Sequence, residues 1–351
     1  MTTPLTWGLT IATYNRADCL RTCVALAVAQ TRPPSEVVIV DASDDWSKAR
    51  DTILSEIAAD NPAVRWTYQQ ARVRSLTHQR NQALDQTTAD VLFLIDDDSF
   101  MFDDCAAEIM AIYEADPEGK IAGVSATLAD NAPGASSSPA REPVWRSALR
   151  RPTQAVAEAF NRFYADELIL PYDDEYPDCD IPASVAGTGA RRCRRIHGMC
   201  MTYRRDAVRK ERFTESLTRY AAGEDLDASY RISRHGALVV APRAKLFHAQ
   251  SSAARLSRYT RVMLGLTNFA FLYRIYGKRP HALVKRLRRG IYRRMFFDVI
   301  TDLGRLRWTV PRLRADVDAL RIFPRIENME RSALDEWYPQ FQTGLIDRNP
   351  S

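Results

Sequence analysis

A short apolar run that ends in three consecutive aspartates constrains the fold of this chain most strongly. Residues 91–95 are all apolar, and Asp96, Asp97 and Asp98 follow at once. Such a run bounded by polar residues is typical of a buried strand in a parallel sheet. The carboxylates would then lie at the carboxyl end of the strand, where open α/β sheets bind their ligands. Because like charges repel, the cluster needs a cation or hydrogen-bond donors; a solvated turn or a helix N-cap near Asp103 is the alternative.

Strand-like and helix-like patterns alternate around this run. The strand patterns cover residues 7–12, 36–40, 64–68, 91–95 and 121–127. The helical patterns between them cover residues 17–30, 46–59, 75–85 and 105–114. This alternation indicates βαβ units, and therefore an α/β fold with a mostly parallel central sheet and helices on both faces.

The pattern is less regular after residue 128. Small residues and prolines make residues 128–143 a loop, and a helix is expected over 155–168. Shorter strand, helix and strand patterns follow at residues 197–203, 221–234 and 238–241. From Tyr259 to about Arg307 the pattern is helical, with a tail to Ser351. We expect one α/β domain over 1–255 and an α-helical extension over 256–351.

The composition is that of an ordinary globular protein. The chain has 351 residues, of which 46% are hydrophobic, and a net charge of +5. No signal peptide is recognisable at Met1, and no apolar run is long enough for a transmembrane helix. The six cysteines form no CxxC pair, so we expect reduced thiols in a cytoplasmic protein.

Six short polar motifs stand at or near the ends of the expected strands and helices. They occupy residues 13–16, 40–44, 79–81, 96–98, 223–225 and 247–248. In this order and spacing they resemble the family 2 glycosyltransferases, over about residues 6–252. The resemblance implies the GT-A nucleotide-sugar-binding fold and a transferase that moves a sugar from a nucleoside diphosphate to an acceptor hydroxyl.

The resemblance also implies a metal site. In the family pattern the last carboxylate, Asp98, binds metal, Asp96 lies nearer the ribose, and Asp97 fits either role. His248 matches the family's metal-binding histidine, with a hydrogen-bonded histidine at a strand end as the alternative. Mn²⁺ or Mg²⁺ would neutralise the diphosphate as the sugar leaves, and an imidazole ligand favours Mn²⁺.

Other motif residues would hold the donor. The resemblance places around the base and phosphates the residues Thr13, Tyr14, Asn15 and Arg16. Asp41 would accept the imide N–H of a pyrimidine, which favours a UDP or dTDP donor over GDP. The alternatives are packing for Tyr14 and a turn or N-cap role for Asp41. Gly198 would let the backbone approach the donor sugar. Arg80 would contact either the diphosphate or the aspartates.

Asp225 is the expected catalytic base, with Glu224 beside it. A base must remove the proton of the acceptor hydroxyl as that oxygen attacks the anomeric carbon. A single base, with no second carboxylate nucleophile, implies one displacement with inversion. Simple capping of the helix by Asp225 or Glu224 is the alternative. No role is expected for His78.

Two charged segments lie outside these motifs. Residues 171–195 are acidic and then basic, and form either a lid over the donor or a solvated loop. Residues 259–307 mix apolar and basic side chains, as in helices that lie on a membrane surface. Packing on the catalytic domain or a dimer contact are the alternatives. Nucleic-acid binding is not expected, because no nucleic-acid motif accompanies the charge.

The expected function is metal-dependent, inverting sugar transfer to a glycan or lipid-linked acceptor. It would serve surface polysaccharide or glycolipid synthesis, in the cytoplasm and at the inner face of the plasma membrane. A nucleotidyltransferase would need a glycine-rich phosphate loop, and residues 10–16 contain no glycine. The other alternative is an inactive nucleotide-sugar-binding or scaffold protein. An inactive protein would tend to lose its metal-binding and catalytic-base residues first, and this chain retains the residues expected in these roles.

Overall fold

The computed structural model describes residues 4–134, 171–173, 175–177, 179–250 and 256–348. The helix expected over 155–168 lies outside these residues. The chain forms two compact units, which we call the α/β unit (residues 1–133 and 177–255) and the helical unit (residues 134–176 and 256–351). The second stretch of the helical unit begins at residue 256, near the boundary expected from the sequence, and the described residues 171–173, 175 and 176 also belong to this unit.

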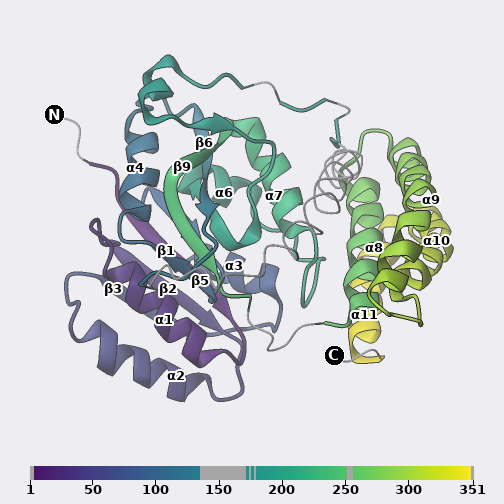
Figure 1. Cartoon of the computed structure of the whole chain (residues 1–351), viewed down its shortest axis with the longest axis horizontal. Helices are drawn as coiled ribbons and strands as arrows, with labels where there is room; N and C mark the ends of the chain where they lie inside the picture. The colour runs from purple at the N-terminus through teal and green to yellow at the C-terminus, as the bar shows by residue number, and fades with distance from the viewer. Residues whose placement is uncertain (1–3, 135–170, 174, 178, 251–255, 349–351) are drawn as a thin grey trace, which may run out of the picture. The chain divides into compact units, whose positions relative to one another are not determined.

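One sheet forms the centre of the α/β unit (Figure 1). Its strands are β1 (Trp7–Thr13), β2 (Glu36–Asp41), β3 (Arg65–Gln70), β4 (Val91–Leu94), β5 (Ser99–Met101), β6 (Ile121–Leu128), β7 (Arg191–Arg192), β8 (Met201–Arg204) and β9 (Ala237–His248). They lie in the order β3-β2-β1-β4-β8-β6-β9-β5, with β7 paired to β9. The α/β class expected from the alternating pattern is confirmed.

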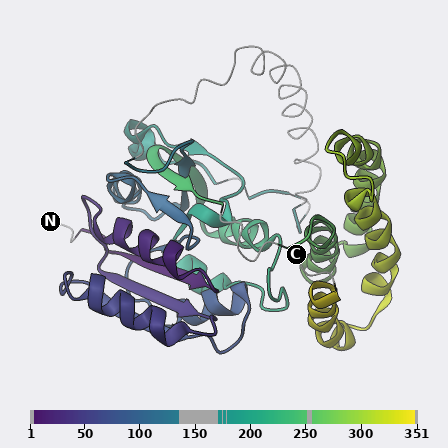
Figure 2. The same ribbon diagram turned by 60° about the horizontal axis from the view of Figure 1, so that its bottom comes forward.

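Helices cover both faces of this sheet (Figures 1 and 2). They are α1 (Ala17–Val28), α2 (Trp46–Ile53), α3 (Leu76–Leu84), α4 (Cys105–Glu114), α6 (Arg205–Glu211) and α7 (Glu224–Ile232). Successive side chains of β4 point to opposite faces. Phe93 packs with Trp7 and α1 on one face, whereas Leu92 packs with α6 and α7 on the other. Because both faces are buried, the strands are continuous apolar runs rather than alternating ones.

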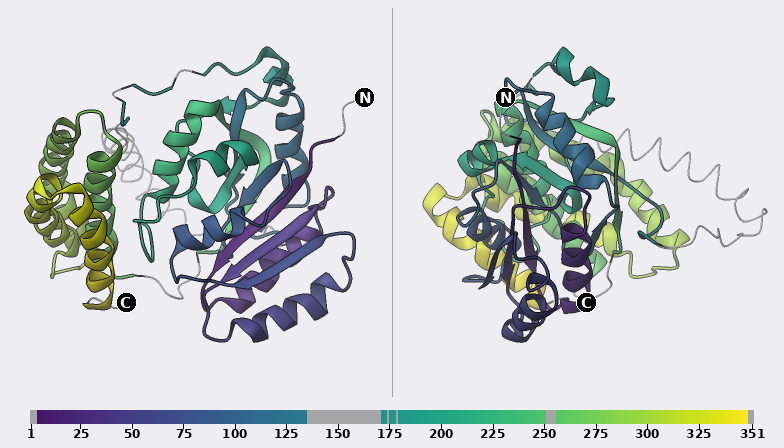
Figure 3. Two further views of the ribbon diagram at one scale, coloured as in Figure 1. Left: turned by 180° about the vertical axis from the view of Figure 1, so that it is seen from behind. Right: turned by 90° about the vertical axis from the view of Figure 1, so that its left-hand side faces the viewer.

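The two halves of the sheet differ in strand direction. β3, β2, β1 and β4 are parallel neighbours, seen from behind in Figure 3, whereas β8 is antiparallel to both β4 and β6. An antiparallel strand needs no crossover connection of the kind that joins parallel strands. β9 is longer than the strand expected over 238–241, and its far end carries His248 to the pairing with β5.

The helical unit contains α8 (Arg258–Tyr276), α9 (Pro280–Gly304), α10 (Pro311–Asn328) and α11 (Arg331–Arg348). The α-helical extension expected from the sequence is therefore present: the helical pattern to about Arg307 forms two helices, α8 and α9, and the tail forms α10 and α11. Gly277 ends α8 and Pro280 opens α9, while α10 and α11 continue through internal prolines, Pro324 and Pro339. A proline inside a helix removes a hydrogen bond, which is why the sequence pattern did not indicate these two helices.

Most apolar side chains of residues 259–307 lie inside the helical unit. Phe271 of α8 stacks on Tyr338 of α11 with ring centroids 4.2 Å apart, and the Tyr338 hydroxyl donates to Asn268. Internal packing thus accounts for much of the amphipathic pattern. Among the described helices, none combines the length and the apolar character needed to cross a bilayer.

Candidate active site

Two carboxylates and one imidazole meet near the ends of β4 and β9. Asp96 and Asp98 follow β4, and the β5–β9 pairing sets Ser99 opposite His248. One ligand atom from each of Asp96, Asp98 and His248 lies within 4.8 Å of the others. Carboxylate oxygens and an imidazole nitrogen suit Mn²⁺ or Mg²⁺. The structure therefore brings together the two residues expected to bind metal, with Asp96 beside them.

His248 and Asp98 also contact each other directly. The Nε2 atom of His248 lies 3.1 Å from Oδ1 of the buried Asp98. This hydrogen bond, together with the charges of Asp98 and Asp96, raises the pKa of His248 above its ordinary value. Oδ2 of Asp98 accepts from Nη1 of Arg16 at 3.1 Å. Two cation donors thus hold this carboxylate, as expected for charge that must be balanced.

Asp97 has a different environment. Its Oδ2 accepts a 2.6 Å hydrogen bond from Thr13 Oγ1, and its Oδ1 lies 3.0 Å from Arg16 Nη1. Burial raises the pKa of Asp97 to about 7, against the attraction of Arg16. Since Asp97 lies outside the three-residue cluster, its contacts tie β1 to the aspartate loop and favour neither of the two roles suggested by the family pattern.

The loop after β1 is built from Tyr14 and Asn15. The guanidinium of Arg74 lies 3.6 Å from the centroid of the Tyr14 ring, a cation–π contact. Asn15 has a positive φ of 50°, and its backbone N–H donates to Ser43 Oγ at 2.7 Å. The loops after β1 and β2 therefore support each other. Tyr14 is half-buried, which agrees with the packing alternative and leaves its expected role at the nucleotide a prediction.

Asp41 lies at the end of β2 and is 1% exposed. Its Oδ1 accepts the Ser43 N–H at 2.7 Å, and its Oδ2 accepts the Tyr68 hydroxyl at 2.6 Å. Burial and the bond to Asp41 raise the pKa of Tyr68. The turn role that the sequence left open for Asp41 is present. A second lone pair on each oxygen could still accept a further donor.

Arg80 holds several acidic groups together. It is 4% exposed, pairs with Glu224 through Nη1, and reaches Asp96 Oδ1 at 3.1 Å through Nη2. Nη2 also donates to the Gly198 carbonyl at 3.3 Å. Burial raises the pKa of Glu224 to about 8, with help from Asp225 and Asp96 and against Arg80. Of the two interpretations of Arg80, these contacts favour the structural ion pair.

Asp225 is the more accessible carboxylate at the start of α7. Its side chain is 17% exposed, and its Oδ2 accepts the Gly198 N–H at 3.2 Å. The N-cap of α7 is Gly223, with φ 89°, and no side chain caps the helix from that position. Asp225 Oδ1 nevertheless accepts the Leu226 N–H at 2.9 Å. Asp225 therefore satisfies one N–H of the first turn while it keeps an exposed edge.

Gly198 lies between these groups. A Cβ at this position would lie 3.2 Å from Glu224 Oε1 and 3.8 Å from both Arg80 Nη2 and the Asp225 Cβ. The close approach that the sequence indicated for Gly198 is present, but the neighbours are these protein side chains.

Several residues of the site were not expected from the sequence. Gln79 donates from Nε2 to the carbonyls of Thr13 and Val40 at 2.9 Å each, and so joins the ends of β1 and β2. Arg195 places Nε 3.9 Å from Asp225 Oδ2 and Nη2 2.6 Å from His197 Nδ1. Gln79 lies in the 79–81 motif, which was a usable signal. Arg195 and His197 have no such signal.

His78 lies apart from this cluster of contacts, whereas the segment 171–195 reaches it at Arg195. His78 lies 3.6 Å from the half-exposed Glu215, in keeping with no expected role. Residues 171–176 group with the helical unit and 177–195 with the α/β unit, where β7 pairs with β9. The lid remains a prediction.

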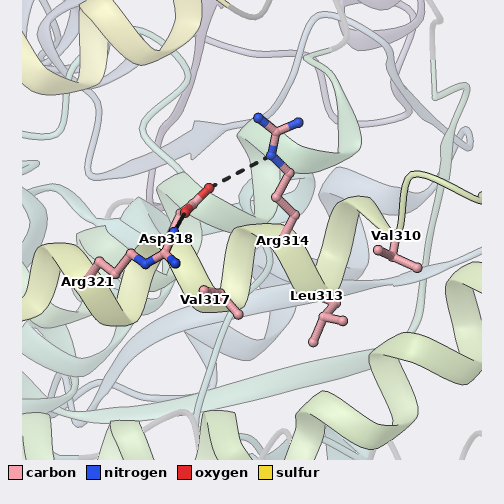
Figure 4. A pocket seen from close by; sticks show the side chains of 6 residues that line it. All are labelled: Val310, Leu313, Arg314, Val317, Asp318 and Arg321. Atoms are coloured by element: carbon pink, nitrogen blue, oxygen red, sulfur yellow. Dashed lines mark hydrogen bonds and ion pairs between the residues drawn. The ribbon is translucent and has the colours of Figure 1, made fainter.

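A surface hollow of about 330 Å³ lies on the helical unit (Figure 4). It is lined by Val310, Leu313, Arg314, Val317, Asp318 and Arg321. Asp318 lies 3.0 Å from Arg321 Nη1 and 4.0 Å from Arg314 Nε, so its charge is already paired. This hollow therefore presents no converging reactive groups, and the better candidate is the cluster around Asp98.

Known proteins show to which family and fold this chain is similar. Residues 9–163 match the family model described as glycosyl transferase family 2. No curated protein matches the chain.

Several solved structures are similar. One is the mannosyltransferase PcManGT from Pyrobaculum calidifontis in complex with GDP-Man and Mn²⁺, at 14% identity and a TM-score of 0.51, covering 98% of this chain and 86% of that one. Another is S. aureus TarS 1-349 in complex with UDP-GlcNAc, at 13% identity and a TM-score of 0.51, covering 97% and 88%. A third is GalNAc-T7 with UDP, GalNAc and Mn²⁺, at 14% identity and a TM-score of 0.54, covering 100% and 59%.

At these identities the likeness establishes the fold, which is the GT-A fold of glycosyltransferases. The family match covers β1 to β4 and the aspartate loop, which supply most of the contacts described above. Residues 9–163 of the chain are thus similar to the family 2 glycosyltransferases.

Proposed function

We propose that the protein is a metal-dependent, inverting glycosyltransferase that uses a UDP- or dTDP-sugar donor. The observation that carries the proposal is the convergence of Asp96, Asp98 and His248 within 4.8 Å. The same Asp96 is joined through Arg80 to Glu224, the neighbour of the proposed base Asp225. The buried guanidinium of Arg80 thereby links the proposed metal site to the neighbour of the proposed base.

A divalent ion bound by Asp98 and His248 would neutralise the charge of the leaving diphosphate. Similar structures were obtained with Mn²⁺, and an imidazole ligand also favours Mn²⁺ over Mg²⁺. Arg16, which touches Asp97 and Asp98, is the side chain best placed to turn from these carboxylates to a phosphate.

Asp225 would take the proton of the acceptor hydroxyl. Its exposed edge leaves room for an acceptor, while the Gly198 and Leu226 N–H groups fix its carboxylate. Glu224 is buried against Arg80 and would hold Asp225 in position rather than exchange protons with substrate. One base on one side of the donor supports a single displacement with inversion.

The donor preference rests on Asp41. Its carboxylate would accept the imide N–H of uracil or thymine, with Tyr68 fixing its orientation. The similar structures contain GDP-Man in one case and UDP or UDP-GlcNAc in the others. They therefore do not discriminate between a guanine and a uracil nucleotide as the donor of this protein. Thr13, Tyr14, Asn15 and Arg16 complete the proposed nucleotide site.

The acceptor would be a hydroxyl of a glycan or a lipid-linked sugar, in surface polysaccharide or glycolipid synthesis. This part of the proposal rests on the family resemblance. A place at the inner face of the plasma membrane would suit such an acceptor.

The test is donor turnover with water or added sugars as acceptor. UDP-, dTDP- and GDP-sugars are incubated with the protein and Mn²⁺, and release of nucleoside diphosphate is measured. Release from a UDP- or dTDP-sugar, with a product of opposite anomeric configuration by NMR, is expected. A product that retains configuration contradicts the mechanism. Nucleotide binding without turnover of any donor favours the inactive scaffold.

A further inference from the structure

The outward face of α9 has a mainly basic amino-terminal half and a mainly apolar carboxyl-terminal half. The exposed basic side chains are Lys285, Arg286, Arg289 and, within the apolar half, Arg293, and the exposed large apolar ones are Tyr292, Phe296, Ile300 and Leu303. Residues three or four apart in a helix lie on the same side, so these eight form one continuous stripe. The turn after α9 extends the apolar half with Leu306 and Trp308, which are 72% and 73% exposed. We call these ten residues the α9 face.

Exposed large apolar side chains are clustered in the apolar half of this face. They make up six of the eleven large hydrophobic side chains that are exposed in the described part of the chain. Other apolar residues of α9, such as Leu287 and Ile291, are buried in the helical unit. The helix therefore has one apolar side for its own core and a second that nothing in the described residues covers. Clustered exposed apolar groups mark interaction sites.

The charge on this face has a single sign. Only two acidic residues occur in α9, Asp298 and Asp302, and they are 1% and 0% exposed. Asp298 pairs with Arg294 at 2.8 Å and with Arg312 at 2.5 Å, inside the helical unit. Asp302 accepts the Arg312 N–H at 2.7 Å. Both carboxylates are thus turned inward, and the α9 face carries positive charge only.

We propose that the α9 face docks on a membrane surface that contains anionic lipids. Lys285, Arg286 and Arg289 would meet the phosphates of the lipid headgroups. Phe296, Ile300 and the other apolar members would enter the region between headgroups and acyl chains. Tyr292 and Trp308 have the amphipathic rings that favour this depth.

Charge complementarity favours a lipid surface over a second copy of this chain. In a two-fold symmetric contact the same face meets itself. The basic half would then lie against either a basic half or an apolar half, and the face supplies no carboxylate to pair with it. An anionic bilayer supplies both the negative charge and the apolar layer.

The proposed membrane contact covers fewer residues than the one expected from the sequence. That expectation covered all of residues 259–307, whereas α8 is largely buried in the helical unit. The inference does not rest on the proposed function, because lipid binding needs neither nucleotide nor metal.

The experiment is cosedimentation of the full chain with vesicles at low salt. One set of vesicles is phosphatidylcholine alone, and the other is phosphatidylcholine mixed with phosphatidylglycerol. One variant combines Phe296→Ser with Trp308→Ser, and a second combines Lys285→Gln, Arg286→Gln and Arg289→Gln. The matched controls are Leu54→Ser with Leu128→Ser, and Lys48→Gln with Arg209→Gln and Lys210→Gln, all at exposed positions of the α/β unit. Circular dichroism verifies that each variant is folded.

The wild type should bind the anionic vesicles and leave the neutral ones in solution. The triple basic variant should lose about a hundredfold in partitioning, and the apolar variant at least about tenfold, while both controls bind like the wild type. Failure of the folded wild type to bind anionic vesicles overturns the proposal. Binding of both α9-face variants at the wild-type level overturns it too. Self-association that Phe296→Ser with Trp308→Ser abolishes, without vesicle binding, would assign the face to a second copy.

Discussion

The imidazole of His248 lies 3.1 Å from the carboxylate of Asp98, although 150 positions separate the two residues in the chain. The contact follows from strand pairing, because β5 begins directly after Asp98 and its first residue pairs with His248. The sheet thus fixes the two proposed metal ligands before any ligand binds. A site held this way loses little entropy when it closes on an ion.

Replacing His248 should weaken Mn²⁺ binding more than Mg²⁺ binding. His248→Gln removes an imidazole nitrogen, which contributes more to Mn²⁺ than to Mg²⁺. We expect about a tenfold to hundredfold loss in Mn²⁺ affinity, measured by calorimetry with UDP or dTDP present. His281→Gln, at an exposed position of the helical unit, is the control. Unchanged Mn²⁺ affinity in His248→Gln would remove the residue from the metal site.

Asp225→Asn should abolish turnover while nucleotide binding persists. The amide keeps the shape of the side chain and loses its basicity, so kcat should fall by roughly a hundredfold or more. The Kd for nucleotide with Mn²⁺ should stay within about threefold, because the proposed metal ligands are untouched. Asp206→Asn serves as control, since that side chain is 93% exposed. Near-normal kcat in Asp225→Asn would exclude Asp225 as the base.

Arg80 should contribute far more to stability than a surface arginine does. Above pH 8, where Glu224 is ionised, Arg80→Met leaves this buried carboxylate without its partner, at a cost of about 3–5 kcal/mol. Arg21→Met breaks a pair with Glu56 whose side chains are 60% and 47% exposed, and should cost about 1 kcal/mol or less. Urea unfolding measures both. Similar losses in the two variants would mean that Arg80 is not the structural centre of this network.

The buried Glu224 should make stability depend on pH. Its pKa is raised to about 8 in the folded protein from an ordinary value of 4.5. Between these values the folded state binds more protons than the unfolded state, so the stabilisation is present at low pH and is lost as pH rises through 8. From pH 6 to pH 9 the wild type should lose roughly 1–3 kcal/mol more than Glu224→Gln does.

Urea unfolding at the two pH values checks this difference. Glu118→Gln, at a side chain that is 68% exposed, should keep the pH dependence of the wild type. Identical pH dependence in wild type and Glu224→Gln would show that Glu224 stays ionised in the fold.

The α/β unit was largely predictable from sequence. Its parallel strands are short apolar runs between helical patterns, and the aspartates after residue 95 locate the edge where the site forms. The antiparallel direction of β8 was not predictable, because strand direction depends on tertiary pairing. The pairing of Asp98 with His248 was expected only through the family resemblance.

Contacts between side chains were harder to predict than the positions of motifs. Arg80 was ambiguous in sequence because an arginine near aspartates suits a phosphate and an ion pair equally, and burial against Glu224 now favours the ion pair. Tyr68 lies in a strand with no motif, yet it orients Asp41. In the helical unit, internal prolines concealed α10 and α11, since propensity alone argues against a helix there.

The most direct test of the central claim is thermal unfolding with nucleotides in Mn²⁺ and then in EDTA. A ligand at a hundredfold excess over its Kd stabilises the folded state by about 2.7 kcal/mol. UDP or dTDP compounds should raise the melting temperature in Mn²⁺, and the shift should vanish in EDTA and in Asp98→Ala but persist in the surface control Asp60→Ala. No shift with any nucleotide in the folded wild type, or an equal shift in Asp98→Ala, would contradict a metal-dependent nucleotide-sugar site at Asp98.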